Sequence, residues 1–410
     1  MWMRHRPMVD VGLLTALLRD PRAVVALPRP GQYLVESARG ALRWLLGLLR
    51  TRRGGKPLRV GVQAFTCRVT LQAIGQSGNR AVLHDIDTDY YSAPRGALGD
   101  PDVDVLILTH LYGIPHPDYV EIASVCRAKD IILIDDACLT RGSSIDGIEV
   151  GTQSDYALHS LGFDKPVSAY AGGELLDNRG DIRETQITEW PEPSAAADKA
   201  DLVRLLVCEH LSEPQRYRAN AMDLLVPWSR PLFWLNARGV LQVSLTKALC
   251  AGTRIGAFRP IERTGRRLTR ARLGKRPVGR FQRMGPRRRS YALTMIERHA
   301  RARQIHQRAK RQAEAKIRSK FPDVHIPSPA QKADCSWHRM PVLTADDHQR
   351  SALLAWLRSH DIEGSCSWPL DVITGNVTSA GERPQRFPNS LRVAQLMINV
   401  PVWSEKIWDF

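Results

Sequence analysis

Apolar stretches recur at regular intervals between residues 58 and 161 and alternate with amphipathic segments. The apolar stretches predict strands, and "IILIDDA" in particular is apolar enough for a strand that is buried on both faces. Helices are expected between them, at 66–78 and 118–130. Strands separated by helices of this length need crossover connections, which predicts an α/β fold with a mostly parallel sheet covered by helices. The predicted strands span 58–64, 80–87, 103–110, 131–137 and 154–161.

The pattern changes in the second half of the chain. Prolines and glycines interrupt it from 181 to about 280, and residues 286–320 predict one long basic helix. A smaller α+β unit is expected after that helix, with a strand at 336–343 and a helix at 345–361. The sequence therefore predicts four parts: an N-terminal segment (1–50), a large domain (51–285) with an irregular insertion (181–280), the basic helix (286–320) and a small C-terminal domain (321–410).

Composition places this 410-residue chain among cytoplasmic globular proteins. Its apolar fraction of 43% is ordinary, no apolar run reaches 18 residues, and the basic start lacks a small-residue cleavage site. Seven cysteines occur singly, without a CxxC pair, which is typical of reduced thiols in a cytoplasm. Closely spaced metal ligands are not visible in the sequence, so no metal site is predicted.

The net charge of +17 is concentrated in one segment. Residues 251–320 contain 23 Lys and Arg but three acidic residues, and the rest of the chain sums to about −3. Four explanations stay open: a solvated basic helix at a dimer interface, the diphosphate of a nucleotide sugar, nucleic acid, and an anionic membrane. Nucleic acid is disfavoured because no recognition motif accompanies the arginines. "LLVPWSRPLFWL", with Trp228 and Trp234, precedes the charge and predicts weak, salt-sensitive peripheral contact with the inner face of a membrane.

Candidate chemical groups follow the ends of the predicted strands. Asp135 and Asp136 end one strand, His110 ends another, and Ser160 and Lys165 follow a third. In an open parallel sheet, ligands bind beyond these carboxyl ends. Small residues also begin a leucine-rich helix, where backbone N–H groups suit a phosphate; they are Ser37 and Ala38, followed by Arg39.

These groups match the needs of pyridoxal 5'-phosphate (PLP) chemistry. PLP requires a lysine for a Schiff base, a carboxylate beside its ring nitrogen, and hydroxyls with a helix N-terminus around its phosphate. Lys165, Asp136, Ser160 and Ser37 are the candidates, and the pair Gly172–Gly173 would let the backbone pass close by. Each residue also has a purely structural explanation: a solvated lysine, an acidic helix cap or turn, a serine N-cap, a hydrogen-bonded core histidine.

Several motifs resemble the DegT/StrS family of sugar aminotransferases, which have the PLP-dependent aspartate-aminotransferase fold (fold type I). They cover most of 30–178 and, more weakly, 283–402, and include "VESARGAL", "IILIDDACLTRG", "VGTQSDYALHSLGFDKPVSAYAGGELL" and "FPNSLRVAQLMINVPVW". The resemblance implies that Lys165 and Asp136 are catalytic, with Lys165 forming the Schiff base, and that the protein is a homodimer with shared active sites. The cofactor-binding set that it implies is Lys165, Asp136, Ser160, Ser37, Ala38, Arg39, Cys67 and Leu139.

Three positions depart from the family pattern. Cys67 stands where an aromatic residue often stacks on the ring, and Leu139 stands where a glutamine usually lies. Phe281, in "FQRMG", replaces an asparagine that reaches the neighbouring subunit's phosphate; Arg280 or Arg283 could substitute for it. The resemblance implies amino transfer, with glutamate as the expected donor, to a keto-sugar nucleotide in polysaccharide or secondary-metabolite biosynthesis. Lys165 argues against the family's dehydratases, which carry histidine there. The alternative is a degenerate aminotransferase fold with a binding or regulatory role.

Overall fold

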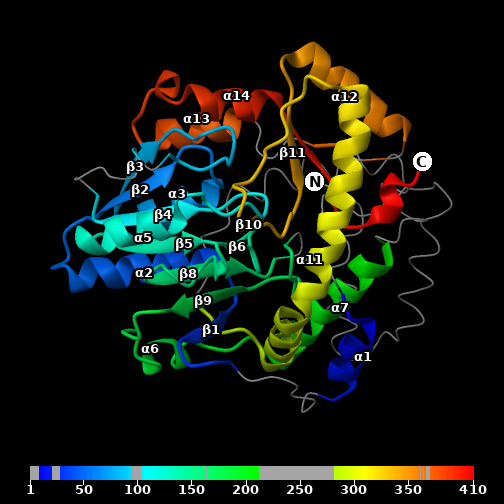
Figure 1. The fold of residues 1–410 in the computed structure, drawn as a ribbon. Helices are drawn as coiled ribbons and strands as arrows, with labels where there is room; N and C mark the ends of the chain where they lie inside the picture. Colours follow the sequence, from blue (N-terminus) through cyan, green and yellow to red (C-terminus); the bar gives the residue numbers. More distant parts are fainter. Residues whose placement is uncertain are drawn as a thin grey trace, which may run out of the picture.

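A seven-stranded sheet forms the centre of the computed structural model, which describes residues 9–20, 28–94, 96, 103–162, 165–211, 281–360, 362, 364–365 and 370–410. Its strand order is β1-β9-β8-β5-β4-β2-β3, and the five strands from β8 to β3 are parallel. This confirms the predicted α/β fold with a mostly parallel sheet (Figure 1). The parallel strands are β2 (Arg59–Gln63), β3 (Arg80–His84), β4 (Val105–Thr109), β5 (Ile132–Asp136) and β8 (Tyr156–Ser160).

Two antiparallel strands extend the sheet beyond β8 and were not predicted. Strand β9 (Gly173–Asp177) pairs with β8, and β1 (Gln32–Val35) pairs with β9. Val35 and Ser160 both lie opposite Gly173 in these ladders. The two strands therefore bring the start of the chain's second helix beside the carboxyl end of β8.

Helices cover both faces of the parallel strands (Figure 1). Helices α2 (Ala38–Arg52) and α3 (Arg68–Gln76) bury leucines and isoleucines against one face, in a cluster that includes Ile134. Helix α5 (Tyr119–Ala128) packs on the other face, in a cluster that includes Leu133. Successive side chains of a strand point to opposite faces, so these clusters fix the side to which each residue at the end of β5 points.

The long helix α11 (Pro286–Lys320) spans the range expected for the basic helix. Its first turns pack with α1 (Val11–Arg19) and α7 (Ala195–Leu211), which follows the short α6 (Thr185–Thr188). From there α11 runs along one side of the sheet towards the C-terminal elements (Figure 1). Helices α6 and α7 occupy the beginning of the segment expected to be irregular, and most of that segment, 212–280, lies outside the described residues.

The C-terminal elements surround the antiparallel pair of β11 (Met340–Leu343) and β12 (Met397–Val400). One hydrophobic cluster joins them to α11 and to the loops after β2 and β4. A second connection pairs β10 (Ala333–Asp334) with β6 (Ser144–Ile145), which pairs with β7 (Ile148–Glu149). The division into four parts remains a prediction. The other C-terminal elements are α12 (Asp347–Ser359), α13 (Leu370–Ser379), η2 (Pro384–Arg386), α14 (Pro388–Leu396) and η3 (Glu405–Trp408).

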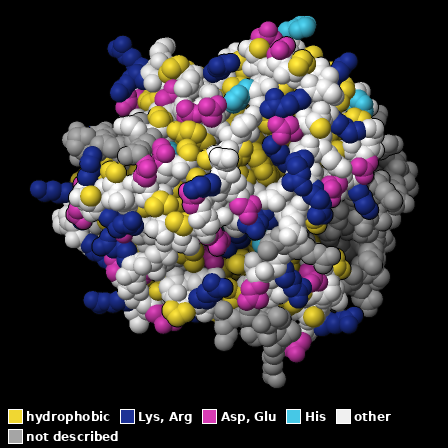
Figure 2. Space-filling view, viewed as in Figure 1, with side chains coloured by type: hydrophobic (Ala, Val, Ile, Leu, Met, Phe, Trp, Pro, Cys, Tyr) yellow, Lys and Arg dark blue, Asp and Glu magenta, His cyan; other side chains and the backbone are white. Residues whose placement is uncertain are grey.

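Acidic partners neutralise much of the positive charge of α11. Arg303 pairs with Asp334 at 2.9 Å, and Arg308 pairs with Glu405 at 2.9 Å. Lys310 and Arg318 share Glu314, at 2.5 and 2.9 Å. Basic and acidic side chains are accordingly intermixed over the face drawn in Figure 2. These pairs favour the interpretation of α11 as a solvated basic helix over that of a nucleic-acid surface.

The membrane prediction concerns a different stretch. Trp228 and Trp234 and the arginines between 254 and 280 lie outside the described residues. Within the described part of the chain, none of the helices has the length and hydrophobicity that crossing a membrane requires.

Candidate functional site

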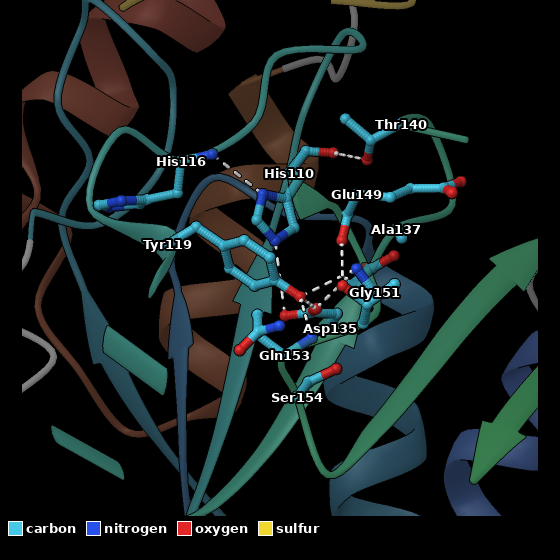
Figure 3. A network of polar contacts seen from close by, with 12 residues as sticks. His110, His116, Tyr119, Asp135, Ala137, Thr140, Glu149, Gly151, Gln153 and Ser154 are labelled. Atoms are coloured by element: carbon cyan, nitrogen blue, oxygen red, sulfur yellow. Dashed lines mark hydrogen bonds and ion pairs between the residues drawn. The ribbon is translucent and has the colours of Figure 1, made fainter. Parts of the chain in front are cut away.

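The two aspartates at the end of β5 have different surroundings. Asp135 is fully buried on the α5 side of the sheet, where its Oδ2 accepts hydrogen bonds from the Tyr119 hydroxyl at 2.5 Å and the Gly151 N–H at 3.0 Å. The Nε2 atom of His110 lies 3.5 Å from its Oδ1 (Figure 3). Burial, and then the Asp135 carboxylate, raise the pKa of Tyr119. Asp135 is therefore a structural residue that ties β5 to α5 and to the loop before β8.

His110 belongs to the same structural network. Its Nδ1 accepts the N–H of His116 at 3.0 Å, so the ring proton lies on Nε2 and faces Asp135 (Figure 3). The His110 carbonyl accepts a hydrogen bond from the Thr140 hydroxyl at 3.2 Å. With both ring nitrogens engaged and the side chain buried, His110 has the structural role that the sequence left open as an alternative.

Asp136 points to the opposite face, towards α2 and α3, and is half-buried. One of its carboxylate oxygens accepts the N–H of Cys138 at 3.3 Å. Burial raises the pKa of the Cys138 thiol well above its usual value; the Asp136 carboxylate adds to this effect and the Lys165 ammonium opposes it. Burial also raises the pKa of Cys67, where Lys165 and Arg39 oppose the shift and Asp136 adds to it. The charges of Lys165 and Asp136 thus influence the pKa of the same two thiols, those of Cys138 and Cys67.

Lys165 is half-buried in the turn that follows β8. Its N–H donates to the Gly162 carbonyl at 3.1 Å, and the Ala169 N–H donates to the Leu161 carbonyl at 3.0 Å, which closes the loop. Val167 and Ala169 anchor the loop in the hydrophobic cluster around α1, α7 and α11. Two apolar residues that follow Lys165 are thus buried in the core, whereas the lysine itself is half-buried.

The N-terminus of α2 adjoins the end of β8. Ser37 is the N-cap of α2, and its Oγ accepts the Gly40 N–H at 3.3 Å. Gly173, opposite Ser160 in the ladder, lies so close to α2 that a Cβ on it would be 2.3 Å from the Ala38 nitrogen. The glycine at 173 therefore permits the contact that brings Ser160 next to the first turn of α2, where backbone N–H groups point out of the helix.

The donor set fits PLP chemically. The α2 side of the sheet presents the Asp136 carboxylate, the Ser160 hydroxyl and the N-terminus of the 15-residue helix α2 with its N-cap Ser37, and Lys165 lies in the turn that follows Ser160. Thr109 also lies opposite Asp136 in the ladder, and its buried hydroxyl has no hydrogen-bond partner among the described residues. A buried polar atom without a hydrogen-bond partner, here next to the Asp136 carboxylate, is expected where a ligand or an ordered water completes the site.

The three departures from the family pattern fall in different places. Cys67, half-buried at the start of α3, lies within the electrostatic reach of Lys165 and Asp136. Leu139 is nearly buried in the cluster shared with the C-terminal elements. Phe281 stacks on Trp190 with ring centroids 5.5 Å apart. The Arg43 guanidinium lies 4.5 Å from the centre of the Phe281 ring.

Neither arginine proposed as a substitute can be assigned to the phosphate. The Arg283 Nε donates to the Trp190 carbonyl at 3.1 Å, and its Nη2 lies 3.4 Å from a carboxylate oxygen of Glu192. Arg280 lies outside the described residues.

Sequence reasoning missed two residues that the structure places at the site. Cys138 approaches the Asp136 carboxylate, and Thr109 is its neighbour across the ladder. The spacing of Cys138, two residues after Asp136, was a usable signal, since alternate positions at a strand end share a face. Thr109 could be identified only once the register between β4 and β5 was known.

Four buried histidines predict a loss of stability in mild acid. Burial lowers the pKa of His116 and His299 to about 3 and that of His159 and His306 to about 4, against about 6.5 in the unfolded chain. Below pH 6.5 the unfolded chain therefore binds more protons than the folded protein, and the free energy of unfolding falls by up to about 1.4 kcal/mol per pH unit for each histidine.

Urea unfolding at pH 7, 6 and 5 measures this effect, and the midpoint is expected to fall steadily. His159→Gln should reduce the pH dependence, whereas His348→Gln, at an exposed position, should leave it unchanged. Equal midpoints at pH 7 and pH 5 would contradict the assignment of these four histidines as neutral in the folded protein.

Comparison with known proteins confirms the predicted fold. Residues 35–188 match the model of the DegT/DnrJ/EryC1/StrS aminotransferase family, which bears out the predicted family resemblance over that range. Spr1654 from Streptococcus pneumoniae, assigned as a sugar aminotransferase and solved in its PLP form, is 14% identical; the match covers 98% of this chain and 94% of that one, with a TM-score of 0.63.

Two further structures are similar over the same extent. The sugar aminotransferase CalS13 from Micromonospora echinospora is 15% identical, with 100% and 96% of the two chains covered and a TM-score of 0.61. The GDP-4-keto-6-deoxy-D-mannose-3-dehydratase of E. coli, with bound hydrated PLP, is 14% identical, with 98% and 95% covered and a TM-score of 0.61. At these identities the structures show the fold alone.

Proposed function

We propose that the protein is a PLP-dependent aminotransferase that transfers an amino group, from glutamate, to a keto-sugar nucleotide. The pathway would be polysaccharide or secondary-metabolite biosynthesis. The proposal rests on the placement of Asp136 and Ser160 on the α2 side of the sheet, beside the N-terminus of α2, with Lys165 in the turn that follows Ser160. The match of residues 35–188 to an aminotransferase family supports it.

Each residue of the site would have a distinct task towards the cofactor. PLP, when bound, supplies an electron sink that stabilises negative charge on the substrate carbon next to nitrogen. The Asp136 carboxylate would hold a proton on the ring nitrogen. Ser37, Ser160 and the first-turn N–H groups of α2, those of Ala38 and Arg39, would bind the phosphate. Cys67 and Leu139 stay predictions as residues that contact the ring.

Lys165 would anchor the cofactor covalently and then move the proton. The Nζ of Lys165 would then serve as the general base and acid, because an amine within reach of the substrate carbon can take up and return its proton. The position of Lys165 suits this role, because its backbone N–H is bonded to the Gly162 carbonyl, Val167 is buried two residues later, and the lysine is half-buried. A lysine here also favours amino transfer over the dehydration carried out by one of the structurally similar proteins.

A second candidate is a protein with the aminotransferase fold that binds without turnover. The packing of Phe281 favours it, because that side chain stacks on Trp190 and offers no polar atom to a phosphate. Cys67 and Leu139 likewise provide neither an aromatic stack nor an amide dipole.

Amino transfer with defined substrates separates the two candidates. Protein loaded with PLP is expected to convert glutamate to 2-oxoglutarate beyond one equivalent per site only when a suitable keto-sugar nucleotide is present, with the aminated sugar detected by mass spectrometry. PLP uptake without such turnover of glutamate, whichever keto-sugar nucleotide of a panel is added, would favour the non-enzymatic candidate. Absence of PLP uptake would exclude both the cofactor and the transfer.

A homodimer in the cytoplasm is proposed together with this activity, because the implied family shares active sites across a dimer. Sedimentation velocity of the purified protein would measure the oligomeric state.

Peripheral membrane contact remains a prediction. Its test is cosedimentation with anionic vesicles at low and high salt, with Trp228 and Trp234 replaced by Ser in the comparison variant.

A further inference from the structure

Arg288, in the first turn of α11, is fully buried among acidic groups. Its Nε lies 3.1 Å from Asp198 Oδ1 and its Nη1 lies 3.0 Å from Asp201 Oδ2, both on α7. Its Nη2 pairs with the Glu36 carboxylate, and its Nη1 also donates to the Ala171 carbonyl at 3.2 Å. One guanidinium therefore joins three separate segments of the chain.

On the α7 side of this network, Asp198 makes further hydrogen bonds to the start of α11. Gly285, the N-cap of α11, makes no side-chain cap, and the Asp198 carboxylate takes over this task by accepting the N–H groups of Arg287 at 2.9 Å and Arg288 at 3.4 Å. A Cβ on Gly285 would lie 2.2 Å from the Asp198 carboxyl carbon, so the glycine permits the approach. Asp198 thus fixes both the start of α11 and the base of the Arg288 side chain.

The other two contacts lie on either side of the proposed phosphate site. Glu36 immediately precedes Ser37, the N-cap of α2, and Ala171 immediately precedes the Gly172–Gly173 pair. Gly173 is the residue that touches the first turn of α2 at Ala38. Arg288 accordingly holds the two backbone segments that flank the start of α2.

The charges of Glu36 and Arg288 also support a role at the start of α2. Glu36 is only partly exposed and immediately precedes Ser37, the N-cap of α2, so an uncompensated charge on it would disfavour an anion at that helix start. Arg288 compensates it. A buried ion network is an inefficient source of stability, because well-packed apolar residues are often at least as stable in its place. A role in positioning explains the network better than stability does.

We propose that Arg288 is a positioning residue for the phosphate-binding turn: through Glu36 and the Ala171 carbonyl it sets the spacing between the N-terminus of α2 and the Gly172–Gly173 segment. The proposal rests on the proposed PLP-dependent function. It concerns a residue that does not itself touch the phosphate and that the sequence motifs did not single out.

The test compares a cofactor that has the phosphate with one that lacks it. Dissociation constants of PLP and of pyridoxal are measured by absorbance for the wild-type protein, Arg288→Met, Arg288→Lys and the control Arg298→Met. Arg298 lies on the same helix and pairs with Asp10, away from α2. Arg288→Met is expected to weaken PLP about tenfold, in keeping with the loss of one helix-terminus anion contact, and to leave pyridoxal within about twofold.

Arg288→Lys keeps the charge but loses the planar fork, so it should recover part of the PLP affinity. Arg288→Lys also tests the positioning role if the Arg288→Met protein does not fold. Equal weakening of PLP and pyridoxal, or unchanged PLP affinity in a folded Arg288 variant, would overturn the positioning role while leaving the proposed function intact. A wild-type protein that binds neither cofactor would overturn the proposed function itself.

Discussion

Lys165→Ala protein is expected to fold normally and to lose amino transfer, with kcat at least about 10² to 10⁴ lower than that of the wild type. The physical reason is that the variant lacks both the covalent anchor of the cofactor and the amine that moves the proton. The loop should survive, because Val167 and Ala169 are buried in the hydrophobic cluster around α1, α7 and α11 and are unchanged in the variant. Steady-state kinetics and circular dichroism together measure this outcome.

Lys56→Ala is the matched control, since Lys56 is exposed in the turn before β2 and lies outside the site. It should keep wild-type activity. If folded Lys165→Ala protein retained more than about a tenth of the wild-type kcat, the role given to Lys165 would be wrong.

The neighbouring aspartates should separate activity from stability. Asp136→Asn is expected to lower kcat by about 10² to 10³, because a preorganised charge at the reacting group is lost, with little change in the free energy of unfolding. Asp135→Asn is expected to lower the free energy of unfolding by about 1 to 3 kcal/mol, because it weakens charge-assisted hydrogen bonds from Tyr119 and Gly151 in a fully buried place.

Urea denaturation and kinetics on both variants provide the comparison. Equal losses of activity, or a larger loss in a still-folded Asp135→Asn protein, would move the ring-nitrogen role from Asp136 to Asp135. The prediction is sharp because the two residues are adjacent and chemically identical, and differ only in the face to which they point.

The parallel core of the fold was predictable because its strands are buried on both faces and so appear as continuous apolar runs. Strand β4, with the sequence VLILT and all five residues buried, is the clearest case. Strand β1 was missed because it has four residues, and β9 was missed because it follows β8 without an intervening helix. Their pairing depends on contacts distant in sequence, which local pattern does not contain.

The candidate site could be proposed from its residue types, but its geometry could not be derived from the sequence. The order of Asp136, Ser160 and Lys165 along the chain indicated the chemistry, and the family resemblance assigned the roles. The surroundings that separate Asp135 from Asp136 emerged only when Tyr119 and Gly151 were placed beside one of them. Arg288 could not have been selected, because it stands among three consecutive arginines, and only the rotation of α11 decides which of them is buried.

Reduction of the PLP-loaded wild-type protein with borohydride tests the central claim most directly. The account predicts that borohydride fixes one cofactor per chain and that peptide mass spectrometry finds it on Lys165. Fixation on a different lysine, or a loaded protein from which reduced cofactor is washed away completely, would contradict the assignment of this turn as the covalent anchor of the cofactor.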